Sequence, residues 1–326
     1  MTRRRHLLVW LAAATVAPRT ALAQQPGRHY RIGYLGPVHP RTESYTAVFE
    51  QRLRELGFAE GRNLAIEVRT FGSQGELLPK LAAELARLNC DVLIAPGAEV
   101  TLRAMKQTSR DTPIVAIAVD YDLDATGHVD NLSRPGGRIT GVTNMQTDLP
   151  AKRLQIIAEI LPRAKRIAVL ADVASAGQLD AAQSAARQLG LMLQVFKFER
   201  APYDLDLAFR AFSEQKAQAL LALGSQFFVP ARKKITDLAL SQRLPSIFHH
   251  SLWAEFGGLV SYGPSFADLF RRAAEQVVMI FKGTKPAEMP VEQPTRLELV
   301  LNLRTAKAIG ITIPQSIMLR ADRAIE

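Results

Sequence analysis

The sequence has too few cysteines and too few long apolar runs for several classes of protein. Cys90 is the only cysteine among 326 residues, which excludes an internal disulfide and a zinc site built from several cysteines. After residue 23 no apolar run approaches the ~20 residues that a membrane span needs. The length predicts two lobes or one large α/β domain, and 48% hydrophobic with 22% charged residues is ordinary globular usage.

The motifs of common enzymes are also missing. The sequence contains no G-x-G-x-x-G after its first predicted strand, no Walker lysine loop and no H-E-x-x-H helix. Ser225 follows a predicted strand but lacks the G-x-S-x-G frame of a nucleophile elbow. His249 and His250 would point to opposite faces of an extended chain, which makes them poor joint metal ligands. We therefore expect no catalytic residue, no metal and no cofactor. An exported α/β hydrolase using Ser225, one of these histidines and an aspartate remains an alternative.

Part of the net charge of +10 belongs to an N-terminal segment that has the features of an export signal. Arg3, Arg4 and Arg5 precede an apolar stretch from Leu7 to Ala17, and an A-x-A site ends at Ala23. This pattern predicts a signal peptide over residues 1–23, cleaved after Ala23, by the Sec or the twin-arginine route. The other basic residues are dispersed and form no stripe with stacking aromatics, so we expect no nucleic-acid partner. The expected product is periplasmic, without a stable membrane anchor.

The rest of the chain alternates short β-branched apolar runs with longer amphipathic stretches, a pattern typical of βαβ units. Strands in the second half begin near residues 166, 192, 219 and 245, a spacing that fits one strand and one crossover helix. We predict an α/β fold of two doubly wound parallel-sheet lobes joined by hinge crossovers. The predicted parts are a first lobe (24–144), a second lobe (145–257), a return to the first lobe (258–292) and a C-terminal segment packing across both lobes (293–326). The hinges are expected near Val142–Asp148 and Gly257–Gly263.

Small molecules bind open α/β sheets beyond the carboxyl ends of the strands and against helix N-termini. Backbone amides near Gly97 and Ala98, with Thr101, are suited to a carboxylate, whereas Asp120, Asp122 or Glu99 would receive an ammonium group. Aromatic walls are expected from Tyr45, Tyr121, Phe227, Phe248 and Trp253. The predicted ligand-binding residues are Pro37, Tyr45, Gly97, Ala98, Glu99, Thr101, Asp120, Tyr121, Asp172, Ser175, Ser225, Gln226, Phe227, Phe248 and His249.

Five segments together form a specific pattern. They are RIGYL (31–35), LRELG with EGRNL (53–64), NLSRPGGRITGV (131–142), GGLVSYGP (257–264) and LELVLNL with TAKA (297–308). With them the sequence resembles the ABC-transporter periplasmic substrate-binding proteins of the tryptophan/tyrosine-type binding group. The resemblance implies a type I periplasmic binding fold that closes over a small-molecule solute and hands it to a membrane permease with its ATPase.

The sequence departs from that family in the predicted ligand loops. It has Pro37-Val38-His39-Pro40 after the first strand, Pro96-Gly97-Ala98-Glu99 after the third, and Asp172-Val173-Ala174-Ser175 in the second lobe. From the two-lobed pattern, the missing enzyme motifs and the resemblance, we expect a monomeric, non-catalytic protein that traps an amino acid or an aromatic or carboxylate compound. A sensor subunit for a membrane receptor kinase is the alternative among binding proteins. A repressor shares the lobe architecture, but this N-terminus offers no helix-turn-helix.

Overall fold

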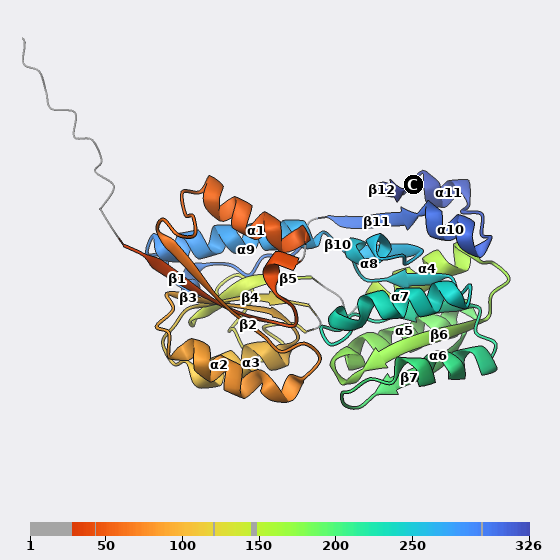
Figure 1. The fold of residues 1–326 in the computed structure, drawn as a ribbon, viewed down its shortest axis with the longest axis horizontal. Coiled ribbons are helices and arrows are strands. Elements are labelled where there is room, and N and C mark those ends of the chain that lie inside the picture. The colour runs from red at the N-terminus through yellow and green to blue at the C-terminus, as the bar shows by residue number, and fades with distance from the viewer. Residues whose placement is uncertain (1–27, 43, 120, 145–148, 295) are drawn as a thin grey trace, which may run out of the picture.

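The computed structural model describes residues 28–326 except 43, 120, 145–148 and 295, and it contains two α/β lobes side by side (Figure 1). The first lobe has a five-stranded, wholly parallel sheet in the order β2-β1-β3-β4-β5. Its strands are β1 (Tyr30–Gly36), β2 (Leu64–Thr70), β3 (Val92–Gly97), β4 (Ile114–Ala118) and β5 (Ile139–Thr143). The central strands β3 and β4 are buried along their whole length, as their continuous apolar sequences require.

Helices cover both faces of this first sheet. α1 (Ser44–Glu55) and α9 (Phe266–Phe281) lie on one face, and α2 (Leu78–Ala86) and α3 (Glu99–Thr108) on the other (Figure 1). One of the four helices that cover this sheet, α9, thus comes from a part of the chain more than a hundred residues beyond β5. Two short 3₁₀ turns, η1 (Pro40–Thr42) and η2 (Gly75–Leu77), follow β1 and β2.

The second lobe has a seven-stranded sheet in the order β12-β11-β10-β9-β8-β6-β7. β6 to β10 are parallel, β11 runs antiparallel to β10, and β12 is parallel to β11. The strands are β6 (Arg166–Asp172), β7 (Met192–Phe198), β8 (Ala219–Ala222), β9 (Ser246–Phe248), β10 (Val260–Pro264), β11 (Leu297–Asn302) and β12 (Arg323–Ile325). The predicted strand spacing and the two-lobed parallel α/β fold are thus confirmed.

Two layers of helices enclose this sheet. α4 (Leu149–Ile160) and α5 (Ala176–Leu189) bury one face, and α6 (Leu205–Glu214) and α7 (Arg232–Ser241) bury the other. Shorter helices complete the lobe: α8 (Ser251–Glu255), α10 (Leu303–Ile309) and α11 (Gln315–Met318), with the 3₁₀ turns η3 (Val173–Ser175) and η4 (Val229–Ala231). Among the described residues, no helix is both long enough and apolar enough to cross a bilayer.

The crossings between the lobes differ from the prediction. β10 was expected in the first lobe, but it pairs with β9 in the second sheet, because Leu259 and Val260 complete that lobe's apolar core. The chain returns at Ser265, runs through α9 and η5 (Pro286–Glu288), and lies beside β5 at Glu292. The first passage, at 145–148, lies outside the described residues.

The C-terminal segment was expected to pack across both lobes, and this is wrong. β11 and β12 add two strands to the second sheet, and α10 and α11 pack on the same lobe. The reason is the apolar run around Leu299–Leu301, which is buried in the second core and would otherwise leave the edge of β10 uncovered.

Candidate functional site

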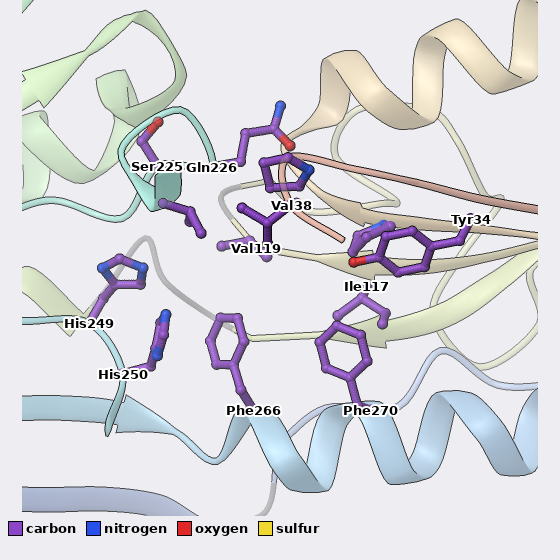
Figure 2. A pocket seen from close by; sticks show the side chains of 14 residues that line it. Tyr34, Val38, Ile117, Val119, Ser225, Gln226, His249, His250, Phe266 and Phe270 are labelled. Carbon is purple, nitrogen blue, oxygen red and sulfur yellow. The ribbon is translucent and has the colours of Figure 1, made fainter. Parts of the chain in front are cut away.

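A cavity lies between the lobes, beyond the carboxyl ends of β1, β3 and β4 in the first lobe and of β8 and β9 in the second (Figure 2). Its lining consists of Tyr34, Pro37, Val38, Pro96, Gly97, Ile117, Val119, Ser225, Gln226, Val229, His249, His250, Phe266 and Phe270. None of these lining residues carries a carboxylate, an ammonium or a guanidinium group. In the described chain no cluster of His, Cys, Asp and Glu is arranged to hold a metal ion.

Three aromatic rings form the wall that the first lobe contributes. Tyr34 comes from β1, and its ring folds over the backbone of Gly36, where a Cβ would lie only 2.5 Å from a ring carbon. Phe266 and Phe270 are four residues apart on α9, so both face the cavity from the same side of that helix (Figure 2). This wall is suited to a flat or branched apolar group.

The second lobe contributes two adjacent histidines that follow β9. The Nδ1 atom of His250 accepts the Leu252 amide at 3.3 Å and caps α8, which assigns the proton of the neutral ring to Nε2. Burial lowers the pKa of His250 to about 3, with smaller effects from Arg232 and Arg153. Burial also holds the pKa of His249 well below its ordinary value. Both rings are therefore neutral at pH 7.

His249 differs from His250 in its hydrogen bonding. Its side chain is 2% exposed, and its Nδ1 atom has no hydrogen-bond partner among the described residues. A buried polar atom without a partner is costly unless another molecule satisfies it. His249 thus has an unsatisfied polar atom in a side chain that lines the cavity.

Ser225 is held by a buried carboxyl group and not by a histidine. Its Oγ donates to Asp172 Oδ2 at 2.5 Å, and the Tyr203 hydroxyl donates to the same oxygen at 3.0 Å. Burial raises the pKa of Asp172, opposed by the hydrogen bonds from Ser225 and Tyr203. Within the described residues neither His249 nor His250 bonds Ser225, so the serine–histidine pair that the hydrolase alternative requires is not formed.

Gln226 connects the two lobes. Its Oε1 atom accepts the backbone amide of Ala98 at 2.9 Å and the hydroxyl of Thr101 at 3.1 Å. These groups lie at the start of α3 and are the donors that we predicted for a carboxylate. Gln226 is 3% exposed, so this contact between the lobes is shielded from water.

The predicted site residues fall into three groups. Those that line the cavity are Pro37, Gly97, Ser225, Gln226 and His249. Those directly behind the lining are Ala98 and Thr101, which bond Gln226, Asp172 and Ser175, which bond each other and support Ser225, and Phe227, which inserts into the first lobe. Those elsewhere are Glu99, Tyr121 and Phe248. The side chain of Tyr45 and all of Asp120 lie outside the described residues.

The residues found elsewhere already have structural roles. Glu99 pairs with Arg103 and with His128, and Tyr121 lies edge-on to His128. Phe248 stacks on Trp253 with ring centroids 4.7 Å apart in the second core. Asp122 is exposed. None of these side chains lines the cavity.

Nine lining residues are not among the predicted ligand-binding residues: Tyr34, Val38, Pro96, Ile117, Val119, Val229, His250, Phe266 and Phe270. Most of them lie at strand ends or in the loops that follow. The sequence indicated these segments but not which of their side chains face the cavity. Phe266 and Phe270 carried a clearer signal, because they share one face of a strongly amphipathic helix that begins directly after a predicted hinge.

Comparisons with known proteins agree on one family. The family model described as ABC transporter substrate binding protein matches residues 38–325. A tyrosine-binding protein from Clostridioides difficile (strain R20291) is 23% identical over 280 residues, which cover 84% of this chain and 78% of the relative.

Solved structures agree in fold. The ABC domain from Streptococcus pneumonia in complex with L-Trp has a TM-score of 0.80 at 22% identity, covering 91% of this chain and 100% of that chain. A conserved domain protein from Vibrio cholerae has a TM-score of 0.82 at 24% identity with the same coverage.

Proposed function

The chain belongs to the family of ABC transporter substrate-binding proteins and has the type I periplasmic binding fold, and on that premise we propose that it traps a small organic solute between its lobes. We further propose that it works in the periplasm as a monomer, after removal of residues 1–23, and delivers the solute to an ABC permease driven by its ATPase.

One observation carries this proposal: the cavity is built from both lobes. Tyr34 and Phe270 come from the first lobe, and Ser225 and His249 come from the second. A solute in this position gains contacts with both lobes only when they approach each other, which is how a ligand shifts a hinged protein toward closure. The Gln226 bonds to Ala98 and Thr101 place the described chain in such an approached arrangement.

The lining supports a particular kind of solute. Aromatic and aliphatic side chains dominate, and its polar groups are neutral: a tyrosine hydroxyl, a serine, a glutamine and two uncharged histidines. Such a lining favours a molecule with an aromatic or branched apolar body and a few polar atoms. The relatives named for tyrosine and L-Trp support an aromatic body.

The test is a thermal-shift screen of the purified exported protein, followed by calorimetric titration. The panel holds amino acids, aromatic acids, aromatic alcohols and short peptides. A solute at 100 times its dissociation constant should stabilise the protein by about 2.7 kcal/mol. A panel that shifts nothing would remove most of the support for a solute trap.

A matched pair of variants locates the site. Val38 lies in the middle of the lining (Figure 2), so Val38→Trp should fill the cavity and abolish binding. Val100 is 40% exposed and does not line the cavity, so Val100→Trp adds the same bulk on the surface and should bind normally. Equal binding by both variants would place the solute elsewhere.

A further inference from the structure

We propose that Gln226 sets the solute class of this cleft: its side-chain amide occupies the carboxylate position at the start of α3, so the cleft selects solutes that are uncharged at that end. The inference rests on the proposed function. It concerns what the cleft rejects, which neither the family nor the relatives specify for this chain.

The groups at the start of α3 that suit a carboxylate already have a partner. The free amides at a helix N-terminus, together with a nearby hydroxyl, favour a negatively charged oxygen. In this chain the Ala98 amide and the Thr101 hydroxyl both donate to Gln226 Oε1, at 2.9 and 3.1 Å. The amide oxygen carries a partial negative charge, so it replaces one oxygen of a solute carboxylate without bringing a net charge.

No room remains between Gln226 and the backbone at the start of α3. Gly97 has a φ of +102°, and a Cβ on it would lie 2.2 Å from Gln226 Oε1 and 3.2 Å from Gln226 Cβ. The glutamine therefore lies directly on the Gly97 backbone, and only a glycine permits this approach. A solute carboxylate reaches the amide of Ala98 only if the glutamine leaves.

The residues on either side of Gln226 in the sequence are both anchored. Its predecessor Ser225 is tied to the buried Asp172 by a 2.5 Å hydrogen bond. Its successor Phe227 has its ring against Phe71 of the first lobe. The backbone of Gln226 is thus anchored on both sides, and its side-chain amide leaves only by a rotation that breaks both hydrogen bonds, to Ala98 and to Thr101. A solute carboxylate must supply that free energy.

The rest of the lining offers a carboxylate no replacement for the donors at the start of α3. The lining residues carry no cationic side chain, and the buried Arg153 near both histidines donates its Nε to the Tyr262 carbonyl at 2.8 Å. An ion moved from water into an apolar site is costly without a partner. A neutral polar group avoids this cost and is served by His249 Nδ1, which has no partner within the described chain. The inferred solute is an aromatic or branched apolar compound with a hydroxyl, carbonyl or amide group.

The experiment compares acids with their matched alcohols. The probes are indole-3-acetate with indole-3-ethanol, and 4-hydroxyphenylacetate with 4-hydroxyphenylethanol, titrated into the exported protein by calorimetry at pH 7. We expect the wild-type protein to bind each alcohol at least tenfold more tightly than its acid. Gln226→Ala should reduce this ratio at least tenfold by improving the affinity for the acid, because the Ala98 and Thr101 donors are released.

Gln218 provides the matched control. Its Oε1 atom accepts two backbone amides, Lys165 N at 2.8 Å and Arg166 N at 3.0 Å, outside the cleft. Gln218→Ala removes an equivalent side chain and should leave the alcohol-to-acid ratio at its wild-type value. Because the ratio is taken within one protein, any general loss of closure in Gln226→Ala cancels.

Three outcomes overturn the inference. They are a wild-type preference for the acids, a ratio that Gln226→Ala leaves unchanged, and no binding of any of the four compounds to either protein. In the first two cases the protein binds a solute, so the proposed function stands. In the third case the thermal-shift screen of the wider panel distinguishes the two proposals. Only if no compound in that panel stabilises the protein is the proposed function also removed.

Discussion

The ring of Phe227 in the second lobe lies edge-on to the ring of Phe71 in the first, with centroids 6.1 Å apart and planes inclined by 63°. Phe227 follows β8, and Phe71 follows β2. The Phe227 ring also covers Gly75, where a Cβ would lie 3.1 Å from a ring carbon. This apolar contact stands beside the Gln226 bonds and joins the lobes at one edge of the cleft.

Gly75→Val should therefore open the cleft. The added side chain meets the Phe227 ring, which must withdraw from the first lobe, and the unliganded protein should show a larger radius of gyration by small-angle X-ray scattering. Affinity for solutes should fall with it, because the closed state becomes less populated. Gly137 has open space around its Cβ position, so Gly137→Val is the control and should match the wild type. An unchanged radius in Gly75→Val would remove this contact from the closure mechanism.

Asp172 should make stability fall as the pH rises in one acidic window. Burial raises its pKa above the ordinary value of 3.8, in spite of the hydrogen bonds from Ser225 and Tyr203. Between the unfolded and the folded pKa the folded state binds more protons than the unfolded state, so the unfolding free energy decreases with rising pH and then levels off. Asp172→Asn lacks this titration. The wild-type advantage over the variant, measured by urea unfolding from about pH 4 to pH 7, should shrink with pH, and an advantage that grows would contradict the raised pKa.

His250 should make the stability of the protein fall as the pH drops, opposite to the effect of Asp172. Its ring is neutral in the folded protein, with a pKa of about 3, but it is protonated below about pH 6.5 when unfolded. The unfolding free energy should therefore fall as the pH drops below 6.5, by about 1.4 kcal/mol per pH unit. His250→Asn keeps an acceptor for the Leu252 amide at the start of α8 and removes this titration. Urea unfolding at pH 7.5 and 5.0 should show a drop smaller by about 2 kcal/mol in the variant; equal drops would mean that this ring is not buried as a neutral group.

How much was predictable depends on how local each feature is. The spacing of strand starts is local, and the structure places them at Arg166, Met192, Ala219 and Ser246, within one residue of expectation. The rule that ligands bind beyond the carboxyl ends of parallel strands also predicted five residues that the structure places around one cavity: Pro37, Gly97, Ser225, Gln226 and His249. Both follow from the period of βαβ units and from the shared edge at which parallel strands end.

The parts that were not predictable depend on pairing between distant segments. β10 and β11 are both short apolar strands, and nothing local states that they pair with each other in the second sheet. The position of β10 in turn decides where α9 begins and hence that Phe266 and Phe270 face the cavity. In the same way, the suitability of Ala98 and Thr101 for a carboxylate was readable, but their occupation by Gln226, more than 120 residues away, was not.

Cys90 should be unreactive until the protein unfolds. Its side chain is 7% exposed, and burial raises the pKa of its thiol to about 11, so very little thiolate is present at pH 8. A colorimetric disulfide reagent should detect almost no thiol in the folded exported protein and about one thiol per chain in 6 M guanidinium. A full thiol signal without denaturant would show that the first lobe opens readily around the start of β3.

His249→Phe should separate stability from binding. The histidine has a buried Nδ1 without a partner among the described residues, and its burial lowers its pKa well below the ordinary value. Phenylalanine keeps an aromatic ring beside Trp253, whose centroid lies 5.6 Å away, and removes both the unsatisfied atom and the titration. The unfolding free energy of the unliganded variant should therefore be higher by roughly 1 to 3 kcal/mol. This gain should be largest at acidic pH, where the unfolded histidine is protonated.

The same substitution should weaken binding, because a solute with a hydroxyl or carbonyl group loses its hydrogen bond to Nδ1, and affinity should fall about tenfold. Calorimetry of the best solute from the screen and urea unfolding of the unliganded protein measure the two effects. If the variant binds as tightly as the wild type, the solute does not use this atom; if it is also less stable, the ring of His249 is held by contacts that a phenyl ring cannot reproduce.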